Sequence, residues 1–114
     1  MVTYFSTYPT TGYAASLLAL GPSAAIPCAP AIANACLIDG TLVQGGKDGY
    51  LFSATGGGAV GGVAMNYYAA ANPLNLYASG DRSFCSIDDG VVRVDGTGTA
   101  IASRATCLAL LPLL

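Results

Sequence analysis

The spacing of apolar residues in the first part of the chain is mostly helical. A run of apolar residues at helical spacing begins after Thr11, which can cap a helix, and ends before Gly21. Asn34 is a second capping residue, and it precedes another short helical segment, residues 35–43. The apolar positions of the two segments are Tyr13, Leu17, Leu18 and Leu20, and then Cys36, Leu37, Val43 and Ile38. Residues 22–34, which include three prolines, are predicted to form an irregular loop between these helices.

The second half of the chain changes to the pattern of strands. β-Branched and aromatic residues gather in four runs separated by turn residues. These runs are residues 50–55, 63–70, 83–87 and 91–94. The last two are joined by Asp88-Asp89-Gly90, and an Asp-Gly pair between β-branched residues is a strong hairpin signal. Residues 2–8 are also aromatic and β-branched, so by propensity alone they indicate a strand that ends at Pro9.

Helices first and a strand meander afterwards indicate an α+β fold. We expect the short helices to pack on one face of a roughly four-stranded antiparallel meander sheet. The chain has 114 residues, which is the size of one domain with a single core. Residues 1–114 are therefore predicted to form one domain.

A glycine-rich segment between two of the predicted strands resembles a phosphate-binding loop. Gly56, Gly58 and Gly61 satisfy the pattern G-x-G-x-x-G, which in dinucleotide-binding folds needs a strand before it and a helix after it. Here the remaining chain is predicted to form hairpins, and the acidic residue that follows at about the right distance, Asp81, precedes a strand. We therefore expect residues 56–62 to form a mobile hairpin loop without phosphate affinity, and we expect no cofactor.

Charged side chains are rare, and their scarcity argues against several classes of function. The chain has four Lys or Arg, six Asp, no Glu and no His, so most general bases and nucleophile activators are absent and an enzyme is not expected. A net charge of −2 without a basic patch argues against a nucleic-acid partner. Polar residues and prolines interrupt the apolar runs before about 18 residues accumulate, so no segment is expected to enter a bilayer. Residues 1–8 lack the basic and apolar regions of a signal peptide.

The four cysteines, Cys28, Cys36, Cys85 and Cys107, are spaced unlike a C-x-x-C redox motif or a zinc knuckle. A metal site is therefore not expected. Of the three connectivities, we favour Cys28–Cys36 with Cys85–Cys107, because each pair is adjacent in sequence and closes a loop of a commonly bridged size. Disulfides imply an oxidising compartment, whereas the alternative is four buried free thiols in a cytosolic core. The apolar residues 106–114 are expected either to dock on the domain through Cys107 or to cover a partner.

The main cluster of acidic residues is Asp88, Asp89 and Asp95. Three carboxylates within eight positions could bind calcium, but they do not match the EF-hand loop. Turn formation is the commoner role of Asp at such positions. Arg93 lies between two valines in a predicted strand, so we expect it to face solvent.

Three stretches together resemble the type IV pilins and pseudopilins, especially bacterial pilins with short globular heads. They are residues 2–21 (VTYFSTYPTTGYAASLLALG), 37–52 (LIDGTLVQGGKDGYLF) and 82–93 (RSFCSIDDGVVR), and the likeness covers nearly the whole chain. In such pilins the first stretch is where a long N-terminal helix passes to a short helix. The second is a short helix entering the first strand, and the third is a late hairpin. The resemblance therefore implies that residues 2–8 are the last turns of a long helix rather than a strand.

By this likeness the chain divides into three parts. Residues 1–9 would be the remnant of the long helix, residues 10–48 the short helices and the loop, and residues 49–114 the antiparallel sheet and C-terminal tail. The family's cleavable leader, followed by an apolar helix with a glutamate near its start, is missing here. This implies either a shortened chain with Met1 added or a split pilin, in which a separate short chain supplies the helix.

The resemblance implies a structural subunit of an extracellular filament on a bacterial surface, serving adhesion, motility or DNA uptake. The missing helix would form the fibre core and contact other copies of the subunit, while this domain would face outside. Two alternatives remain. One is the major pseudopilin of a type II secretion system, where a late loop often binds calcium, as Asp88, Asp89 and Asp95 could. The other is a secreted, disulfide-bonded binding module that uses Tyr-rich loops.

Overall fold

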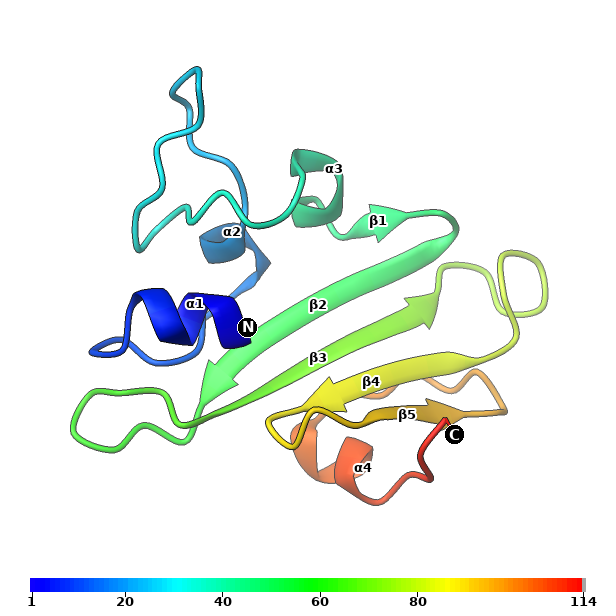
Figure 1. The fold of residues 1–114 in the computed structure, drawn as a ribbon. Coiled ribbons are helices and arrows are strands. Elements are labelled where there is room, and N and C mark those ends of the chain that lie inside the picture. Colours follow the sequence, from blue (N-terminus) through cyan, green and yellow to red (C-terminus); the bar gives the residue numbers. More distant parts are fainter. Residues whose placement is uncertain (114) are drawn as a thin grey trace.

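A five-stranded antiparallel sheet with short helices forms the domain (Figure 1). The structure is a computed structural model and describes residues 1–113. The helices are α1 (Val2–Thr7), α2 (Leu17–Leu20), α3 (Gly40–Val43) and α4 (Arg104–Leu108). The strands, in their order across the sheet, are β1 (Gly46–Lys47), β2 (Tyr50–Gly57), β3 (Asn66–Pro73), β4 (Ser83–Ile87) and β5 (Val92–Asp95). Among residues 1–113, no helix reaches the length and apolarity of a bilayer span.

The sheet has one strand more than the four predicted. The additional strand, β1, contributes only two residues and pairs antiparallel with the start of β2. The turn between them consists of Asp48 and Gly49, with φ of 53° and 80°. Two positive φ values in a two-residue hairpin loop are the pattern that favours Asp-Gly. The turn residues were visible in the sequence, but a two-residue strand is too short to show a pattern.

The long central hairpin of β2 and β3 differs from its predicted boundaries. Gly56 and Gly57 continue β2 and pair with Tyr67 and Asn66, so they do not belong to the loop. Residues 63–65 lie before β3, although their side chains are apolar. The β4–β5 hairpin lies close to where the Asp-Gly signal predicted it.

The helices before the sheet are shorter than predicted. In place of a helix from Thr11, only four residues of α2 are helical. In place of a helix capped by Asn34, α3 begins after Asp39, whose side chain accepts a hydrogen bond from the Leu42 amide at 2.7 Å. The segment between these caps is not helical, because the amides of residues 35–38 donate to main-chain carbonyls of residues 19–21. Tertiary hydrogen bonds thus replaced helical ones here.

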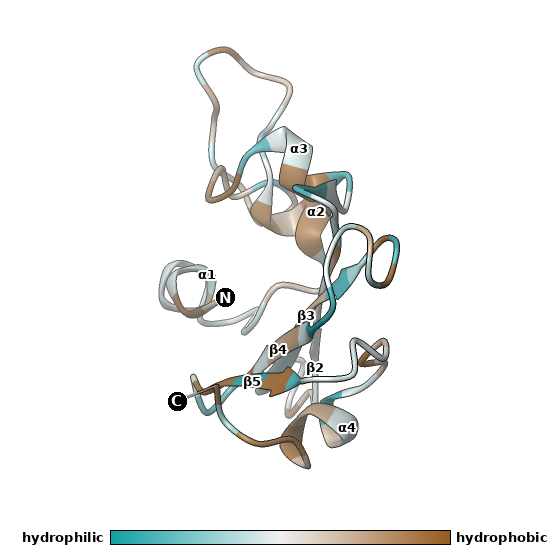
Figure 2. Ribbon diagram, turned by 90° about the vertical axis from the view of Figure 1, so that its right-hand side faces the viewer, coloured by the Kyte–Doolittle hydropathy of each residue, from teal (hydrophilic) through white to brown (hydrophobic). Residues whose placement is uncertain are grey.

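The two faces of the sheet carry separate clusters of buried residues, and α1 and α4 lie on opposite sides of the sheet (Figure 2). On one face, α4 and the tail pack on β3 and β4; this cluster contains Ala70, Cys85, Ile87, Ile101 and Cys107. On the other face lie α1 and α2; this cluster contains Tyr4, Ala14, Leu20 and Ala35. The alternating burial along β4 shows that its odd-numbered residues face α4. The even-numbered side therefore faces the half of the molecule that contains α1.

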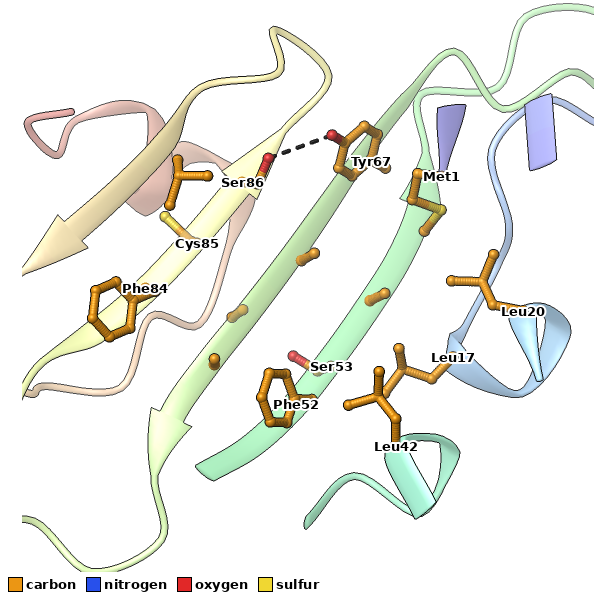
Figure 3. Close-up of a pocket in the computed structure, with 15 residues that line it drawn as sticks. Met1, Leu17, Leu20, Leu42, Phe52, Ser53, Tyr67, Phe84, Cys85 and Ser86 are labelled. Carbon is orange, nitrogen blue, oxygen red and sulfur yellow. Dashed lines mark hydrogen bonds between the residues drawn. The ribbon is translucent and has the colours of Figure 1, made fainter. Parts of the chain in front are cut away.

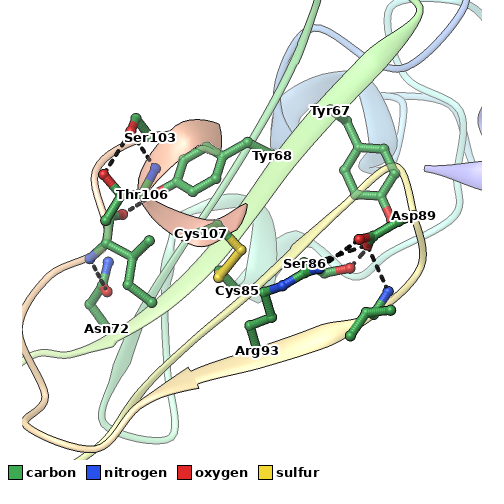
Figure 4. Close-up of a disulfide and its surroundings, with 12 residues drawn as sticks. Tyr67, Tyr68, Asn72, Cys85, Ser86, Asp89, Arg93, Ser103, Thr106 and Cys107 are labelled. Atoms are coloured by element: carbon green, nitrogen blue, oxygen red, sulfur yellow. Dashed lines mark hydrogen bonds and ion pairs between the residues drawn. A yellow bond between two sulfur atoms is a disulfide. The ribbon is translucent and has the colours of Figure 1, made fainter. Parts of the chain in front are cut away.

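Both predicted disulfides are present. Cys28–Cys36 closes the loop before α3, with 6.2 Å between the Cα atoms. Cys85–Cys107 joins β4 to α4, with 6.0 Å between the Cα atoms (Figure 4). The tail after α4 then pairs with β5, because the Leu113 amide donates to the Val92 carbonyl and Arg93 forms a bridge with Pro112. Of the two roles expected for the described part of the tail, docking on the domain is the one observed.

Candidate functional site: an apolar groove on the sheet

An open groove crosses the sheet face on the side of α1 and α2 (Figure 3). Strand register places its floor residues in rows. Phe52, Ala71 and Phe84 are directly opposite one another on β2, β3 and β4. In the next row, Ala54 pairs with Ala69. Small side chains therefore occupy the middle of the floor, with aromatic rings beside them.

The walls of the groove come from the N-terminal half of the chain. Leu17 and Leu20 of α2 and Leu42 of α3 face the floor, and Met1 lies at the edge beside Tyr67 (Figure 3). The groove has a volume of about 370 Å³, and none of the side chains that line it is charged. An apolar surface of this kind suits an apolar partner rather than a polar small molecule.

Helix α1 is held at one end of the groove by aromatic contacts. The ring of Phe5 lies 4.8 Å from that of Tyr13, which lies 4.8 Å from that of Tyr67 on β3. Tyr4, only 1% exposed, donates a hydrogen bond from its hydroxyl to the Ile32 carbonyl at 2.7 Å. These contacts direct the N-terminal end of α1 towards the sheet (Figure 1). Residues 2–7 are helical, so the strand that their propensity indicated is wrong.

The acidic residues considered for calcium binding are not brought together. Asp88 pairs with Arg104 at 2.7 Å, Asp89 pairs with Arg93 at 2.7 Å, and Asp95 accepts hydrogen bonds from Thr97. Within residues 1–113, no group of three or more potential metal ligands is found. Each carboxylate therefore has a structural partner that explains its position.

The predicted exposure of Arg93 is wrong. Arg93 is 9% exposed, and its guanidinium donates two hydrogen bonds to the carboxylate of Asp89 (Figure 4). Its side chain shares the sheet face of Cys85, its partner in β4, while Val92 is 47% exposed on the opposite face. β5 therefore directs Arg93 towards the covered face of the sheet and Val92 towards the open face, which is the reverse of the prediction. The reason is that the groove face is open, whereas the opposite face is covered by α4 and the tail.

Acid should weaken the fold through these two ion pairs. Hydrogen bonds from Arg104 and Arg93 lower the pKa of Asp88 and Asp89 below the ordinary value. A carboxylate with a lowered folded-state pKa stabilises the fold above its unfolded pKa of about 3.9, and this contribution is lost as pH falls from there through the folded value. We expect thermal midpoints to change little above about pH 5 and to fall below about pH 4.

The double variant Asp88→Asn/Asp89→Asn tests this assignment. Its thermal midpoint at neutral pH should be lower, and its decline in acid should be shallower, because two of the titrating groups are gone. Asp81→Asn removes an exposed carboxylate that forms no salt bridge within residues 1–113 and is the matched control. Parallel acid profiles of the wild type and the double variant would contradict the assignment.

The glycine pattern does not have the structure of a nucleotide-binding loop. The segment that follows it is strand β3, not a helix, and the sheet is antiparallel throughout. Gly56 has a different role: a Cβ atom there would lie 2.6 Å from the Ala14 carbonyl oxygen and 2.7 Å from that of Tyr13. Glycine at this position lets the backbone of residues 13 and 14 approach β2 closely.

The groove itself was not predicted from the sequence. β3 carries no alternating signal, because Ala69, Ala70 and Ala71 are all apolar; the only one lies in β2, where Phe52 and Ala54 occupy alternate positions. Such alternation indicates one face of a strand but not whether that face is covered.

Comparisons with protein families, with curated proteins and with solved structures find no match to this chain.

Proposed function

We propose that this chain is the globular head of a subunit of a type IV pilin-like extracellular filament, in which the groove receives an apolar helix. The observation that carries the proposal is the groove of uncharged side chains beside the N-terminal end of α1. The helix would either continue α1 in the upstream direction or belong to a separate chain. In both cases its exposed side would contact the helices of neighbouring subunits and build the fibre core.

The chemistry of the groove floor supports this occupant. A helix is about 10 Å across, and small side chains such as Ala54, Ala69 and Ala71 let it approach the sheet closely. Each 100 Å² of apolar surface that is withdrawn from water contributes about 2.5 kcal/mol. The resemblance of three stretches to pilins points to the same occupant. The two disulfides are consistent with the oxidising surroundings of a surface filament.

The pseudopilin alternative depended on a calcium site at Asp88, Asp89 and Asp95. Because two of these carboxylates are in ion pairs with arginines, the feature that favoured this alternative has a simpler structural explanation. The filament subunit is therefore the better-supported reading.

Supplying the helix tests the proposal. An apolar helix of about 25 residues, fused ahead of Val2 or added as a partner chain in detergent, should convert a monomer at micromolar concentration into regular fibres. The reason is that the head alone offers too little apolar area for a stable interface, whereas the helix would supply most of the apolar contact area between subunits. Light scattering and electron microscopy distinguish the monomer from the fibre.

Ala71→Glu places a charge on the groove floor and should abolish fibre formation by the helix-bearing protein. Thr55→Glu introduces the same charge at an exposed position on the other side of β2 and serves as the control. Fibres that form equally well with Ala71→Glu, or a helix-bearing protein that never assembles, would refute the proposed function.

A further inference from the structure

The two disulfides lie in opposite surroundings. In the second, Cys85 and Cys107 are 3% and 0% exposed and belong to the buried cluster between α4 and the sheet. In the first, Cys28 is exposed and Cys36 is half-buried, and the loop that they close stands away from the sheet beyond α2 and α3 (Figure 1). A thiol in solution can therefore reach the first disulfide of the folded protein, whereas the second becomes accessible when α4 leaves the sheet.

Hydrogen bonds converge on one sulfur of the first disulfide. The amide and the hydroxyl of Ser23 both donate to Cys28 Sγ, at 3.1 and 3.5 Å. The amides of Ala25 and Ala29 donate in turn to Ser23 Oγ, at 3.3 and 2.9 Å, and these bonds strengthen its hydroxyl as a donor. A neutral sulfur is a weak acceptor, whereas a thiolate is a charged and stronger one. The network therefore suits the thiolate that Cys28 becomes when the bond is broken.

The other cysteine of the first disulfide has an unfavourable backbone conformation. Cys36 has a φ of 59°, in the left-handed region that residues with a side chain rarely adopt. Its amide is fixed by a hydrogen bond to the Gly21 carbonyl at 2.9 Å. Such a conformation persists only while the surrounding bonds enforce it. Breaking the disulfide removes one of these constraints, so the backbone strain favours the open loop.

We propose that Cys28–Cys36 is a thiol–disulfide exchange site, which dithiols reduce in the folded protein while the second disulfide stays closed. One thiolate of the dithiol attacks Cys36 Sγ and forms a mixed disulfide, and Cys28 leaves with the electron pair as a thiolate held by Ser23. The second thiolate of the dithiol then attacks the dithiol sulfur of this mixed disulfide, and Cys36 leaves. The dithiol is oxidised to a disulfide, and its two electrons and two protons pass to the two protein thiols.

Opening the first disulfide loosens the attachment of α1. The Tyr4 hydroxyl of α1 donates to the Ile32 carbonyl within the loop, and Tyr4 shares a buried cluster with Ala35. Without the crosslink the loop gains conformational freedom, so this hydrogen bond weakens and α1 is held less firmly. The exchange site thereby couples the redox state of the surroundings to the position of α1. The inference does not depend on what occupies the groove.

Reduction of the folded domain by dithiothreitol, followed by alkylation and peptide mapping at successive times, tests the site. In native buffer we expect the first disulfide to be reduced at least about a hundredfold faster than the second, and in denaturant at a similar rate. Amide chemical shifts of the singly reduced protein should change at Tyr4 and residues 22–38 but not in α4. Simultaneous loss of both disulfides in native buffer, or shifts that spread to α4, would overturn the inference.

Ser23→Ala separates the hydrogen-bond network from exposure alone. Without the hydroxyl the Cys28 thiolate is less stabilised, so reduction should be about threefold slower. In the reduced variant, alkylation of Cys28 should begin at a higher pH than in the wild type. A purely structural role predicts faster reduction, because a looser loop exposes the disulfide further.

Ser16→Ala is the matched control for this substitution. It removes an exposed hydroxyl that makes no capping hydrogen bond at α2, so neither the reduction rate nor the alkylation profile should change. Reduction of Ser23→Ala at the wild-type rate or faster would refute the role of Ser23 and, with it, the exchange site. These measurements use the domain alone, so their outcome is independent of whether the helix-bearing protein forms fibres.

Discussion

Replacement of both Cys85 and Cys107 by alanine is expected to lower the free energy of unfolding by about 2–4 kcal/mol. The bond spans 22 positions of the sequence, so its loss raises the conformational entropy of the unfolded chain considerably. Both residues are also buried, at 3% and 0% exposure, within the cluster that contains Ile87 and Ile101. Denaturant unfolding followed by circular dichroism measures the loss.

The other disulfide provides the comparison. Cys28–Cys36 spans only 8 positions and lies in the exposed loop, so the chain-entropy effect of its removal should be about 1 kcal/mol smaller. Removing it should leave α4 and the tail in place. An equal or larger loss from Cys28→Ala/Cys36→Ala would mean that the projecting loop, rather than the attachment of α4, is the main source of disulfide stabilisation.

Gly56→Ala is expected to destabilise the domain by about 3 kcal/mol, although it adds one methyl group. The new Cβ atom would lie within 2.7 Å of two main-chain oxygens, those of Tyr13 and Ala14, and a backbone segment cannot move away as a flexible side chain can. Residues 13 and 14 would have to leave β2, and Tyr13 connects Phe5 of α1 to Tyr67 on the sheet. Thermal and denaturant unfolding measure the effect.

Gly96→Ala is the matched control for this substitution. A Cβ atom at Gly96 would have no non-neighbouring atom of residues 1–113 within 4 Å, and the φ of Gly96 lies outside the left-handed region, so the change should stay within about 0.5 kcal/mol. A neutral result for Gly56→Ala would show that residues 13 and 14 are not held against β2. Phosphate-induced protection of Gly56 would restore the nucleotide-binding interpretation that the fold argues against.

Much of the sheet was predictable because the sequence patterns that indicate its strands and turns lie within short stretches of the chain. An Asp-Gly turn between β-branched residues located the β4–β5 hairpin, and runs of aromatic and β-branched residues on either side of the glycines located β2 and β3. The pairing of Cys28 with Cys36 and of Cys85 with Cys107 followed from proximity along the chain. The ends of β2 and β3 were less accurate, because glycine has low strand propensity and yet Gly56 and Gly57 pair in the ladder.

The candidate site could not be predicted in the same way. Its floor and walls come from β2, β3 and β4 and from α2 and α3, which are brought together only by folding. Local patterns indicated two longer helices between residues 11 and 43, but amides of residues 35–38 bind carbonyls of residues 19–21 instead. Helical propensity is a weak preference, and hydrogen bonds to another segment outweighed it here.

By itself, the sequence determined the kind of elements, the positions of most turns, the pairing of the cysteines and the scarcity of charge. These properties depend on residues that are near one another in the chain. Only the tertiary structure decided which face of each strand is covered. It buried Arg93 on the sheet face that α4 covers, left Val92 exposed on the groove face, and made Gly56 a point of contact between two backbones. The physical reason is that alternation distinguishes the two faces of a strand, whereas their burial depends on segments that arrive from elsewhere in the chain.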